Sequence, residues 1–312
     1  MINMARINES QYRDMFLNET MHYPAFLDSL KDDVSAKVTN HISDMIKSGV
    51  CDDEFMLDVD CEYADKIIVH ISLDSNKDVR DKKAIHADYF NSGDVLVDGK
   101  LYKPTIRLFC PVNGDVYNYF AVKYRLSHEL THLYDDWNSI RNGNGSICRS
   151  PQNMDTTEFL KDSATGAQPV LRNVAFLAYM SLNSERQSFL SQTVQELEGL
   201  GCNQWNYREK LKETDTYNNI TKSHEGVVNC ANNMTDSDLH MLNLWVTSQF
   251  PKARIPKMNA GDFDAERYRT MLLKWADRVY HETMKSYGSV VQYYIDNLKE
   301  EWNRNANYFI LD

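Results

Sequence analysis

The spacing of hydrophobic residues changes twice along this chain of 312 residues. Up to about residue 50, apolar side chains recur at intervals of three and four, which predicts an amphipathic helix that ends at Gly49. Between residues 55 and 111 the interval falls to two, in β-branched and aromatic runs separated by Asp, Asn, Ser and Gly. These runs predict a small mixed sheet with strands at 55–60, 66–73, 95–99 and 104–111.

The second change follows Asn113-Gly114-Asp115, where Asp115 is a favourable N-cap for a helix that we expect from Val116 to Trp137. Residues 141–168 are rich in Gly, Asn, Ser and Thr, which indicates a long polar loop or flap. Helical spacing resumes at about residue 169 and continues to the end. The sequence therefore predicts an α+β fold whose four parts are a helical segment at 1–50, a sheet and helix at 51–140, the loop at 141–168 and a helical part at 169–312.

Composition narrows the class of protein. The net charge of −11 argues against a nucleic-acid partner, because binding a phosphate backbone requires a basic surface. The apolar run at 174–180 is far shorter than the roughly 20 residues of a membrane-spanning helix, and the N-terminus lacks the apolar core of a signal peptide. Six scattered cysteines without a C-x-x-C pair indicate free thiols. We therefore expect a cytoplasmic protein that contacts no membrane.

The segment RLSHELTHLYDDW, residues 125–137, contains the pattern H-E-x-x-H. On a helix His128 and His132 lie about 40° apart, with Glu129 on their flank at about 100° from His128. The opposite face is apolar and carries Leu126, Leu130, Leu133 and Trp137. Two imidazoles one turn apart can converge on a zinc ion, so we expect Zn²⁺ at His128 and His132, with Glu129 as a general base that does not bind the metal.

Residues 104–137 resemble the zincin metallopeptidases, whose shared elements are a small sheet and an active-site helix with H-E-x-x-H. The resemblance implies that the strand at 105–111 is the edge strand on which an extended peptide docks. The metzincin branch would require Gly at 135 and His at 138, where this chain has Asp135 and Asn138. The resemblance is therefore to the gluzincin-like branch, which takes its third ligand, a Glu, from a later helix.

Glu185 is the favoured third ligand, in the first turn of a helix that Asn183 or Ser184 can cap. The surrounding pattern Y-x-S-x-x-x-E, formed by Tyr179, Ser181 and Glu185, resembles small gluzincin-like proteins of bacteria and phages. One departure is Phe189, where the best-known gluzincins carry an Asp that supports a zinc histidine. The alternatives for the third ligand are Asp135, Asp136, Glu196, Glu198 and the pair His224-Glu225. For Asp135 and Asp136 we prefer a different role, as acceptors for an imidazole N–H.

These observations lead us to expect zinc-dependent hydrolysis of a peptide or protein substrate, with an oxyanion donor among Tyr179, His224 and Arg172. One alternative is a non-catalytic structural or binding protein on a zincin scaffold, such as a phage component, so the location is cytoplasmic or phage-associated. Another is a zinc hydrolase that acts on a non-peptide amide. The remaining histidines show no ligand spacing, which is typical of surface or hydrogen-bonded side chains.

Overall fold

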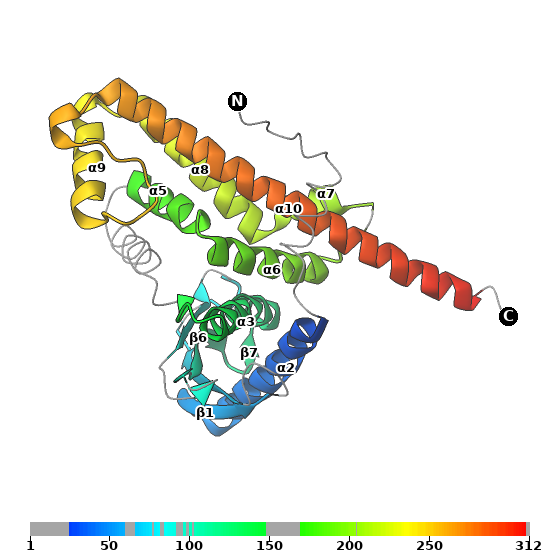
Figure 1. Cartoon of the computed structure of the whole chain (residues 1–312). Helices are drawn as coiled ribbons and strands as arrows, with labels where there is room; N and C mark the ends of the chain where they lie inside the picture. Colours follow the sequence, from blue (N-terminus) through cyan, green and yellow to red (C-terminus); the bar gives the residue numbers. More distant parts are fainter. Residues whose placement is uncertain are drawn as a thin grey trace.

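The structure is a computed structural model, and it describes residues 25–59, 66–76, 78–81, 84–91, 96–97, 100–101, 103–147, 169–203 and 205–309. The first half of the predicted N-terminal helix and most of the predicted polar loop lie outside the described residues. Within them, a small mixed sheet with two helices precedes a second part made of helices (Figure 1). The prediction of an α+β fold with a mainly helical C-terminal part is confirmed.

The main sheet has the strand order β1-β2-β6-β3, and a short strand β7 pairs with the end of β6. Strands β2 and β6 are parallel to each other, whereas β1, β3 and β7 are antiparallel to their neighbours, so the sheet is mixed as predicted. A separate hairpin is formed by β4 and β5. The strands are β1 Asp52–Asp58, β2 Lys66–Asp74, β3 His86–Asn91, β4 Leu96–Val97, β5 Lys100–Leu101, β6 Pro104–Asn113 and β7 Val116–Tyr117.

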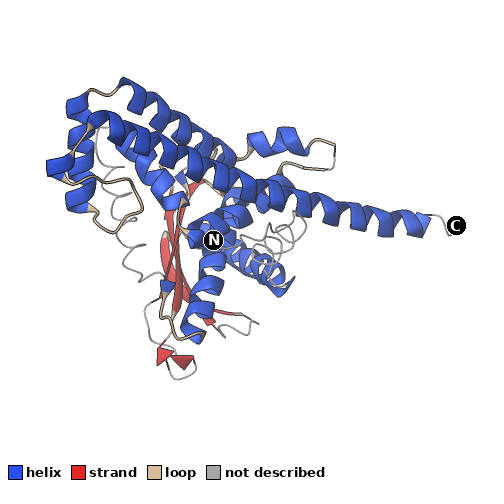
Figure 2. Ribbon diagram, turned by 45° about the horizontal axis from the view of Figure 1, so that its top comes forward, coloured by secondary structure: helices blue, strands red, loops and turns tan. Residues whose placement is uncertain are grey.

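One face of the sheet is buried because its strands alternate apolar and polar positions. Val69 of β2 pairs with Ile106 of β6, and both are fully buried, whereas the next pair, His70 and Arg107, points to the other face. The buried face packs against helix α2, Ala25–Ser48, and against the apolar side of helix α3, Tyr119–Arg141. Figure 2 shows the strands edge-on beside these helices. Helix α2 ends where Gly49 adopts a φ of 72°, as expected.

The sheet differs from the prediction in three respects. Strand β3 was not predicted, and of the expected strand at 95–99 the structure describes Leu96 and Val97, which form β4 and pair with β5. The third difference concerns the strand at 105–111, which lies inside the sheet between β2 and β3 and is therefore not an edge strand. Strand β3 pairs with β6 on the side away from β2, so β3 forms the edge of the sheet beside α3. The local spacing of apolar residues gives no information about such a pairing between segments distant in the chain.

Helix α3 begins later than expected, at Tyr119. Asp115 is not its N-cap, because Gly114 and Asp115 form the turn between β6 and β7, where Gly114 has a φ of 62°. The N-cap is Asn118, whose side-chain oxygen accepts a hydrogen bond from the backbone N–H of Ala121. The backbone N–H and C=O groups of Val116 and Tyr117 thus take part in the pairing with β6 and not in hydrogen bonds of a helix.

The C-terminal part contains helices α5 to α10 and has a core of its own. The long helix α10 is continuous through Gly288, and its end extends past the other helices (Figure 1). Among the described residues no helix is long and apolar enough to cross a membrane. The helices are α5 Pro169–Met180, α6 Asn183–Gly199, α7 Tyr207–Glu213, α8 Asp215–Asn233, α9 Asp236–Gln249 and α10 Ala265–Phe309, with a short 3-10 helix η3 at Ala260–Asp262.

Helix α6 joins the two parts by packing along α3. His132 of α3 faces Ser188 of α6. Five residues earlier in α3, the hydroxyl oxygen of Ser127 lies 3.0 Å from that of Ser191. Farther along, Gly199 approaches the Tyr124 hydroxyl so closely that an added Cβ would lie 2.1 Å from its oxygen. The numbering rises in one helix as it falls in the other, so α3 and α6 are antiparallel neighbours.

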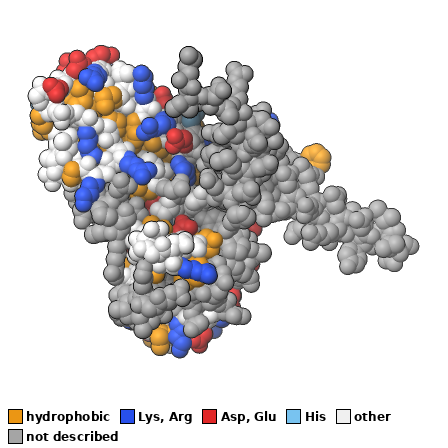
Figure 3. Space-filling view, viewed as in Figure 1, with side chains coloured by type: hydrophobic (Ala, Val, Ile, Leu, Met, Phe, Trp, Pro, Cys, Tyr) orange, Lys and Arg blue, Asp and Glu red, His pale blue; other side chains and the backbone are white. Residues whose placement is uncertain are grey.

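The described cysteines Cys51, Cys110, Cys202 and Cys230 are free thiols, as expected. On the face drawn in Figure 3, basic and acidic side chains are interspersed over the helical part, with hydrophobic side chains between them.

Candidate metal centre

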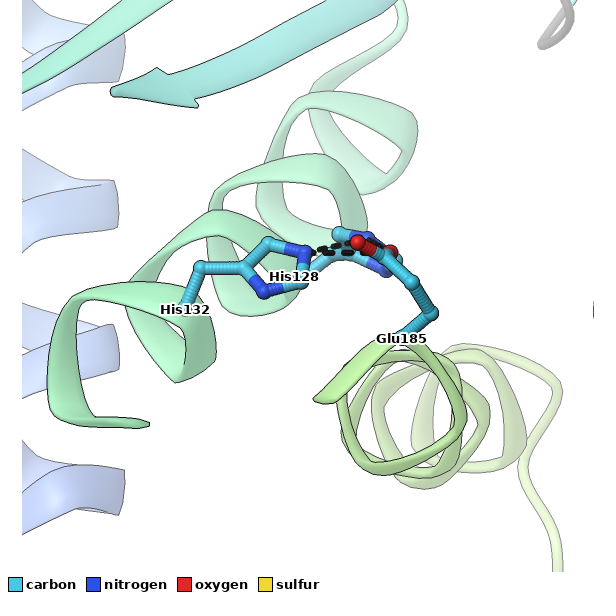
Figure 4. A group of neighbouring side chains, drawn as sticks. All are labelled: His128, His132 and Glu185. Carbon is cyan, nitrogen blue, oxygen red and sulfur yellow. Dashed lines mark hydrogen bonds and ion pairs between the residues drawn. The ribbon is translucent and has the colours of Figure 1, made fainter. Parts of the chain in front are cut away.

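Three side chains from two helices converge at the interface of α3 and α6. His128 and His132 extend from α3, one turn apart, and Glu185 points at both imidazoles from the first turn of α6 (Figure 4). The two Nε2 atoms lie 3.2 Å apart. Glu185 Oε2 lies 3.2 Å from Nε2 of His132 and 3.6 Å from Nε2 of His128. The structure thus brings the predicted histidines together with the favoured third residue in a group that could hold a metal ion.

These distances match the requirements of a small tetrahedral cation. Ligand atoms held at about 2.0–2.1 Å in tetrahedral geometry lie about 3.3–3.4 Å from one another. The three separations here, 3.2, 3.2 and 3.6 Å, bracket that value. Among the described residues, Glu185 Oε2 is buried with the two imidazole nitrogens as its close polar neighbours, an arrangement that suits an acceptor facing a cation. The two nitrogens and one carboxylate oxygen therefore fit a metal ion such as zinc.

Helix α6 begins at Asn183 with Leu182 at the N-cap and no side-chain cap, so neither Asn183 nor Ser184 caps it as expected. Glu185 nevertheless lies in the first turn, where the positive end of the helix dipole favours a carboxylate. The backbone N–H of Arg186 bonds to the carbonyl of Leu182, which makes this first turn regular. Glu185 therefore extends from a regular turn of helix.

Burial and mutual charge set the protonation of the cluster. His128, His132 and Glu185 are between 5% and 9% exposed. Burial lowers the pKa of His128 to about 4, so this imidazole is neutral and its Nε2 can act as a ligand. Burial, the largest single effect, opposes the charged form of His132, but the charge and hydrogen bond of Glu185 together with the charges of Glu129 and Asp135 raise the pKa of His132 to about 9. Burial likewise opposes the ionised form of Glu185, whose pKa is lowered by the neighbouring His132 and His128.

Glu129 lies beside the cluster without belonging to it. It is 5% exposed, and burial raises the pKa of its carboxyl to about 8, against the opposing charge of His132. The charges of Glu185 and of Asp88 on β3 act in the same direction as burial. The carboxyl is thus near the edge strand as well as the cluster, with a pKa suited to accepting and returning a proton near neutral pH.

The second nitrogens of the two imidazoles have different environments. Nδ1 of His132 lies 3.2 Å from the Ser188 hydroxyl oxygen, one turn after Glu185 on α6. Nδ1 of His128 is buried and has no hydrogen-bond partner among the described residues. Instead, the ring of Phe189 packs edge-on against His128, with 4.6 Å between ring centroids. Phe189, the departure from the gluzincin pattern, therefore contacts a histidine of the cluster without supporting it by a hydrogen bond.

The two aspartates that follow His132 occupy different environments. Asp136 is fully buried, and its two oxygens accept hydrogen bonds from the Tyr89 hydroxyl and from the backbone N–H of Ile147. It therefore ties α3 to the edge strand β3, and its oxygens accept no hydrogen bond from an imidazole of the described residues. Asp135 is half-buried, and its charge acts on His132. Burial raises the pKa of Asp135 to about 7.

Of the three expected oxyanion donors, the structure brings Tyr179 of α5 to the cluster. Burial, the charge of Glu185 and a hydrogen bond with Glu185 all raise the pKa of the Tyr179 hydroxyl, which stays protonated and can donate. His224 instead pairs with Asp277 of α10, 2.8 Å from Nε2 to Oδ1, and stacks on Tyr280. Arg172 is exposed on α5.

The other candidates for third ligand also lie elsewhere. Glu196 accepts hydrogen bonds from Gln192 and Thr216, and Glu198 lies 4.0 Å from the ammonium of Lys123. Glu225 is exposed.

Two contributors to the site were not identified from the sequence. Ser188 lies three residues after Glu185, so it shares a helix face with that carboxylate, and this spacing could have indicated it. Tyr89 had no such signal, because its link to Asp136 joins positions 47 apart in the chain.

Comparisons of the chain with known protein families, with curated proteins and with solved structures gave no match.

Proposed function

We propose that the chain is a zinc-dependent metallopeptidase of the zincin type, from the gluzincin-like branch. The observation that carries the proposal is the spacing of 3.2, 3.2 and 3.6 Å among the Nε2 atoms of His128 and His132 and Oε2 of Glu185, next to a buried Glu129. Three protein ligands leave a position open, which is typical of catalytic zinc sites. A zinc ion held there acts as a Lewis acid and lowers the pKa of a water ligand.

In this proposal Glu129 accepts a proton from the attacking water at its carboxylate and returns it to the nitrogen of the leaving amine. The position of Glu129 supports that double role, because its buried carboxyl directly follows His128 on α3, and a carboxyl gives up a proton far more readily than an amine. The Tyr179 hydroxyl donates a hydrogen bond to the oxyanion that develops on the scissile carbonyl. Ser188 orients His132 by accepting its Nδ1–H.

The edge strand β3 is the proposed docking site for the peptide main chain. Among the described strands β3 pairs only with β6, and Asp88 on β3 is near enough to raise the pKa of both Glu129 and Tyr179, in addition to the dominant effect of burial. An extended peptide could dock beside the cluster by adding a strand next to β3, a common mode of peptide recognition. This gives β3 the role that the family resemblance implied for the strand at 105–111.

The test is the variant Glu129→Gln, which keeps the size of the side chain and removes its basicity. We expect the metal content of the purified chain to stay at one equivalent while peptide hydrolysis falls by about 10²- to 10⁴-fold. Glu198→Gln is the matched control, because Glu198 lies on the surface of α6. Hydrolysis that continues undiminished in Glu129→Gln would remove Glu129 as the base.

A second function is favoured by the contact between Phe189 and His128. Because His128 Nδ1 lacks a hydrogen-bond partner among the described residues, this histidine has less support than a zinc ligand usually has. The alternative is a non-catalytic structural or binding protein that retains a metal site. Stoichiometric zinc in a chain that cleaves no member of a broad peptide library would establish the alternative over the peptidase.

A further inference from the structure

Arg125 stands on the same face of α3 as the metal cluster. It precedes His128 by three residues and Glu129 by four, the two spacings that bring helical side chains together. At 100° per residue it lies at about 60° from His128, between His132 at about 40° and Glu129 at about 100°. Alongside burial, which has the largest effect, the charge of Arg125 acts on the pKa of both His128 and Glu129.

The environment of Arg125 differs from that of comparable cations. Three arginines are half-buried among the described residues: Arg125, Arg186 and Arg269. Arg186 has Glu282 at 3.8 Å, and Arg269 has Asp236 and Glu266 as well as three backbone carbonyls. No carboxylate oxygen of a described residue lies within 4.0 Å of the Arg125 guanidinium.

Two carboxylates in the surroundings of Arg125, those of Asp88 and Asp32, pair with other cations. Asp88 on β3 acts on Glu129, but its own carboxylate is 3.6 Å from Arg107. Lys123, two residues before Arg125, is paired with Asp32 at 3.0 Å. In a chain with a net charge of −11, a half-buried guanidinium that has no carboxylate partner among the described residues and lies beside the metal cluster indicates a counter-charge brought by a ligand.

The face of α3 is also polarised along its length. Arg125 lies at one end and the half-buried Asp135 at the other, about 15 Å apart along the helix axis, with His128 and His132 between them. A negative group of a bound peptide is therefore favoured at the Arg125 end and disfavoured at the Asp135 end.

We infer that Arg125 is a specificity residue that binds a carboxylate of the peptide substrate close to the scissile bond. The planar guanidinium can donate two parallel hydrogen bonds to a carboxylate, a geometry that lysine cannot reproduce. The carboxylate belongs either to an acidic side chain or to the C-terminus of the peptide. This inference rests on the proposed function, since it assumes that a peptide occupies the site.

The experiment uses the full, metal-loaded chain and two sets of peptides. In the first set both ends are blocked and one Glu is exchanged for Gln at successive positions. In the second set no acidic side chain is present and the C-terminus is either free or amidated. Binding is measured on the uncleaving Glu129→Gln background, and hydrolysis is measured on the unchanged chain.

We expect a preference of about tenfold or more for the carboxylate in one of the two sets, and that set identifies its source. Arg125→Gln in the same background removes the preference, and Arg125→Lys keeps part of it. The control Arg141→Lys, at the exposed end of the same helix, keeps all of it. Metal content and the unfolding midpoint are measured for each variant. If Arg125→Gln does not fold, the inference is tested by Arg125→Lys alone, which should lose part of the preference for the carboxylate.

Equal binding of acidic and neutral peptides, or a preference that Arg125→Gln or Arg125→Lys leaves unchanged, would overturn the inference. The proposed function fails separately. If no peptide is hydrolysed but binding still shows the Arg125-dependent preference, the carboxylate site stands without the peptidase. If peptides are hydrolysed with no such preference, the peptidase stands without the carboxylate site.

Discussion

The two histidines and the glutamate of the candidate metal centre come from regions of different construction. The first region, α2 with the sheet and α3, has a core in which strand pairing sets the position of each side chain. The second, α5 to α10, has a core of helices alone. His128 and His132 share one helix of the first region, so their separation follows from local geometry. Glu185 joins them only because α6 packs along α3.

The comparison shows where such a site is vulnerable. The histidine pair is present wherever α3 is helical, whereas the third ligand requires the interface between the regions to close. Ser127, Ser191 and the buried Lys31 help to hold that interface, with 2.6 Å from Lys31 Nζ to Ser191 Oγ. If the site binds metal, the metal links two cores that otherwise meet through helix packing.

The largest expected effect comes from removing the ligand of the second region. In Glu185→Ala the histidine pair remains, but two ligands hold a divalent metal poorly. We expect affinity to fall by more than the roughly 10- to 100-fold that loss of a supporting residue costs. Metal analysis after dialysis checks this, with Glu198→Ala on the same helix as the control. Unchanged metal content in Glu185→Ala would remove Glu185 as a ligand.

A cavity in either core tests whether the regions respond together. Leu130 in the first core and Leu272 in the second are both fully buried. We expect Leu130→Ala and Leu272→Ala each to lower the free energy of unfolding by about 2–5 kcal/mol. If metal binds across both regions as proposed, a concentration 100 times the dissociation constant should restore about 2.7 kcal/mol in either variant. Denaturant unfolding with and without zinc measures this, and recovery in one variant alone would mean that the ion belongs to a single region.

A smaller effect distinguishes residues that contribute to metal affinity from residues that stabilise the interface between α3 and α6. Ser188→Ala removes the hydroxyl beside His132, and we expect metal affinity to fall by about tenfold with little change in stability. Ser191→Ala removes a hydroxyl that bonds across the interface, so stability should fall by about 1 kcal/mol while metal affinity holds. Metal titration gives the metal affinity of each variant, and denaturant unfolding gives its free energy of unfolding. The same loss of metal affinity in both would show that Ser188 has no specific role.

The smallest effect concerns pH and involves only the second region. Burial raises the pKa of Glu196, between α6 and α8, above its ordinary value of 4.5. The folded state therefore holds this proton more tightly than the unfolded state, and the resulting stability is present at low pH and lost as the pH rises through the folded pKa. Glu196→Gln should flatten that decline. Unfolding free energies measured from pH 4.5 upward test it, and an identical slope in the variant would contradict the assignment.

Much of the fold was predictable because neighbouring positions in the chain carried the signal. Strands β1, β2 and β6 were predicted from the alternation of apolar and polar residues, whose apolar members lie in one core. The apolar and polar faces of α3 were predicted from the helical spacing of its residues. Strand β3 was missed, and the strand at 105–111 was wrongly expected at an edge, because strand order depends on pairing between distant segments. The start of α3 was also misjudged, since the pairing of β7 with β6 was not visible locally.

The sequence by itself determined the chemistry available at the site: two imidazoles four residues apart, a glutamate beside the first of them, and an apolar face behind. Only the tertiary structure decided which carboxylate completes the group. It brought Glu185 within 3.2 Å of His132, paired Asp136 with Tyr89 and placed His224 against Asp277. The physical reason is that a helix sets distances over one or two turns, whereas the approach of α6 to α3 is set by the packing of two cores.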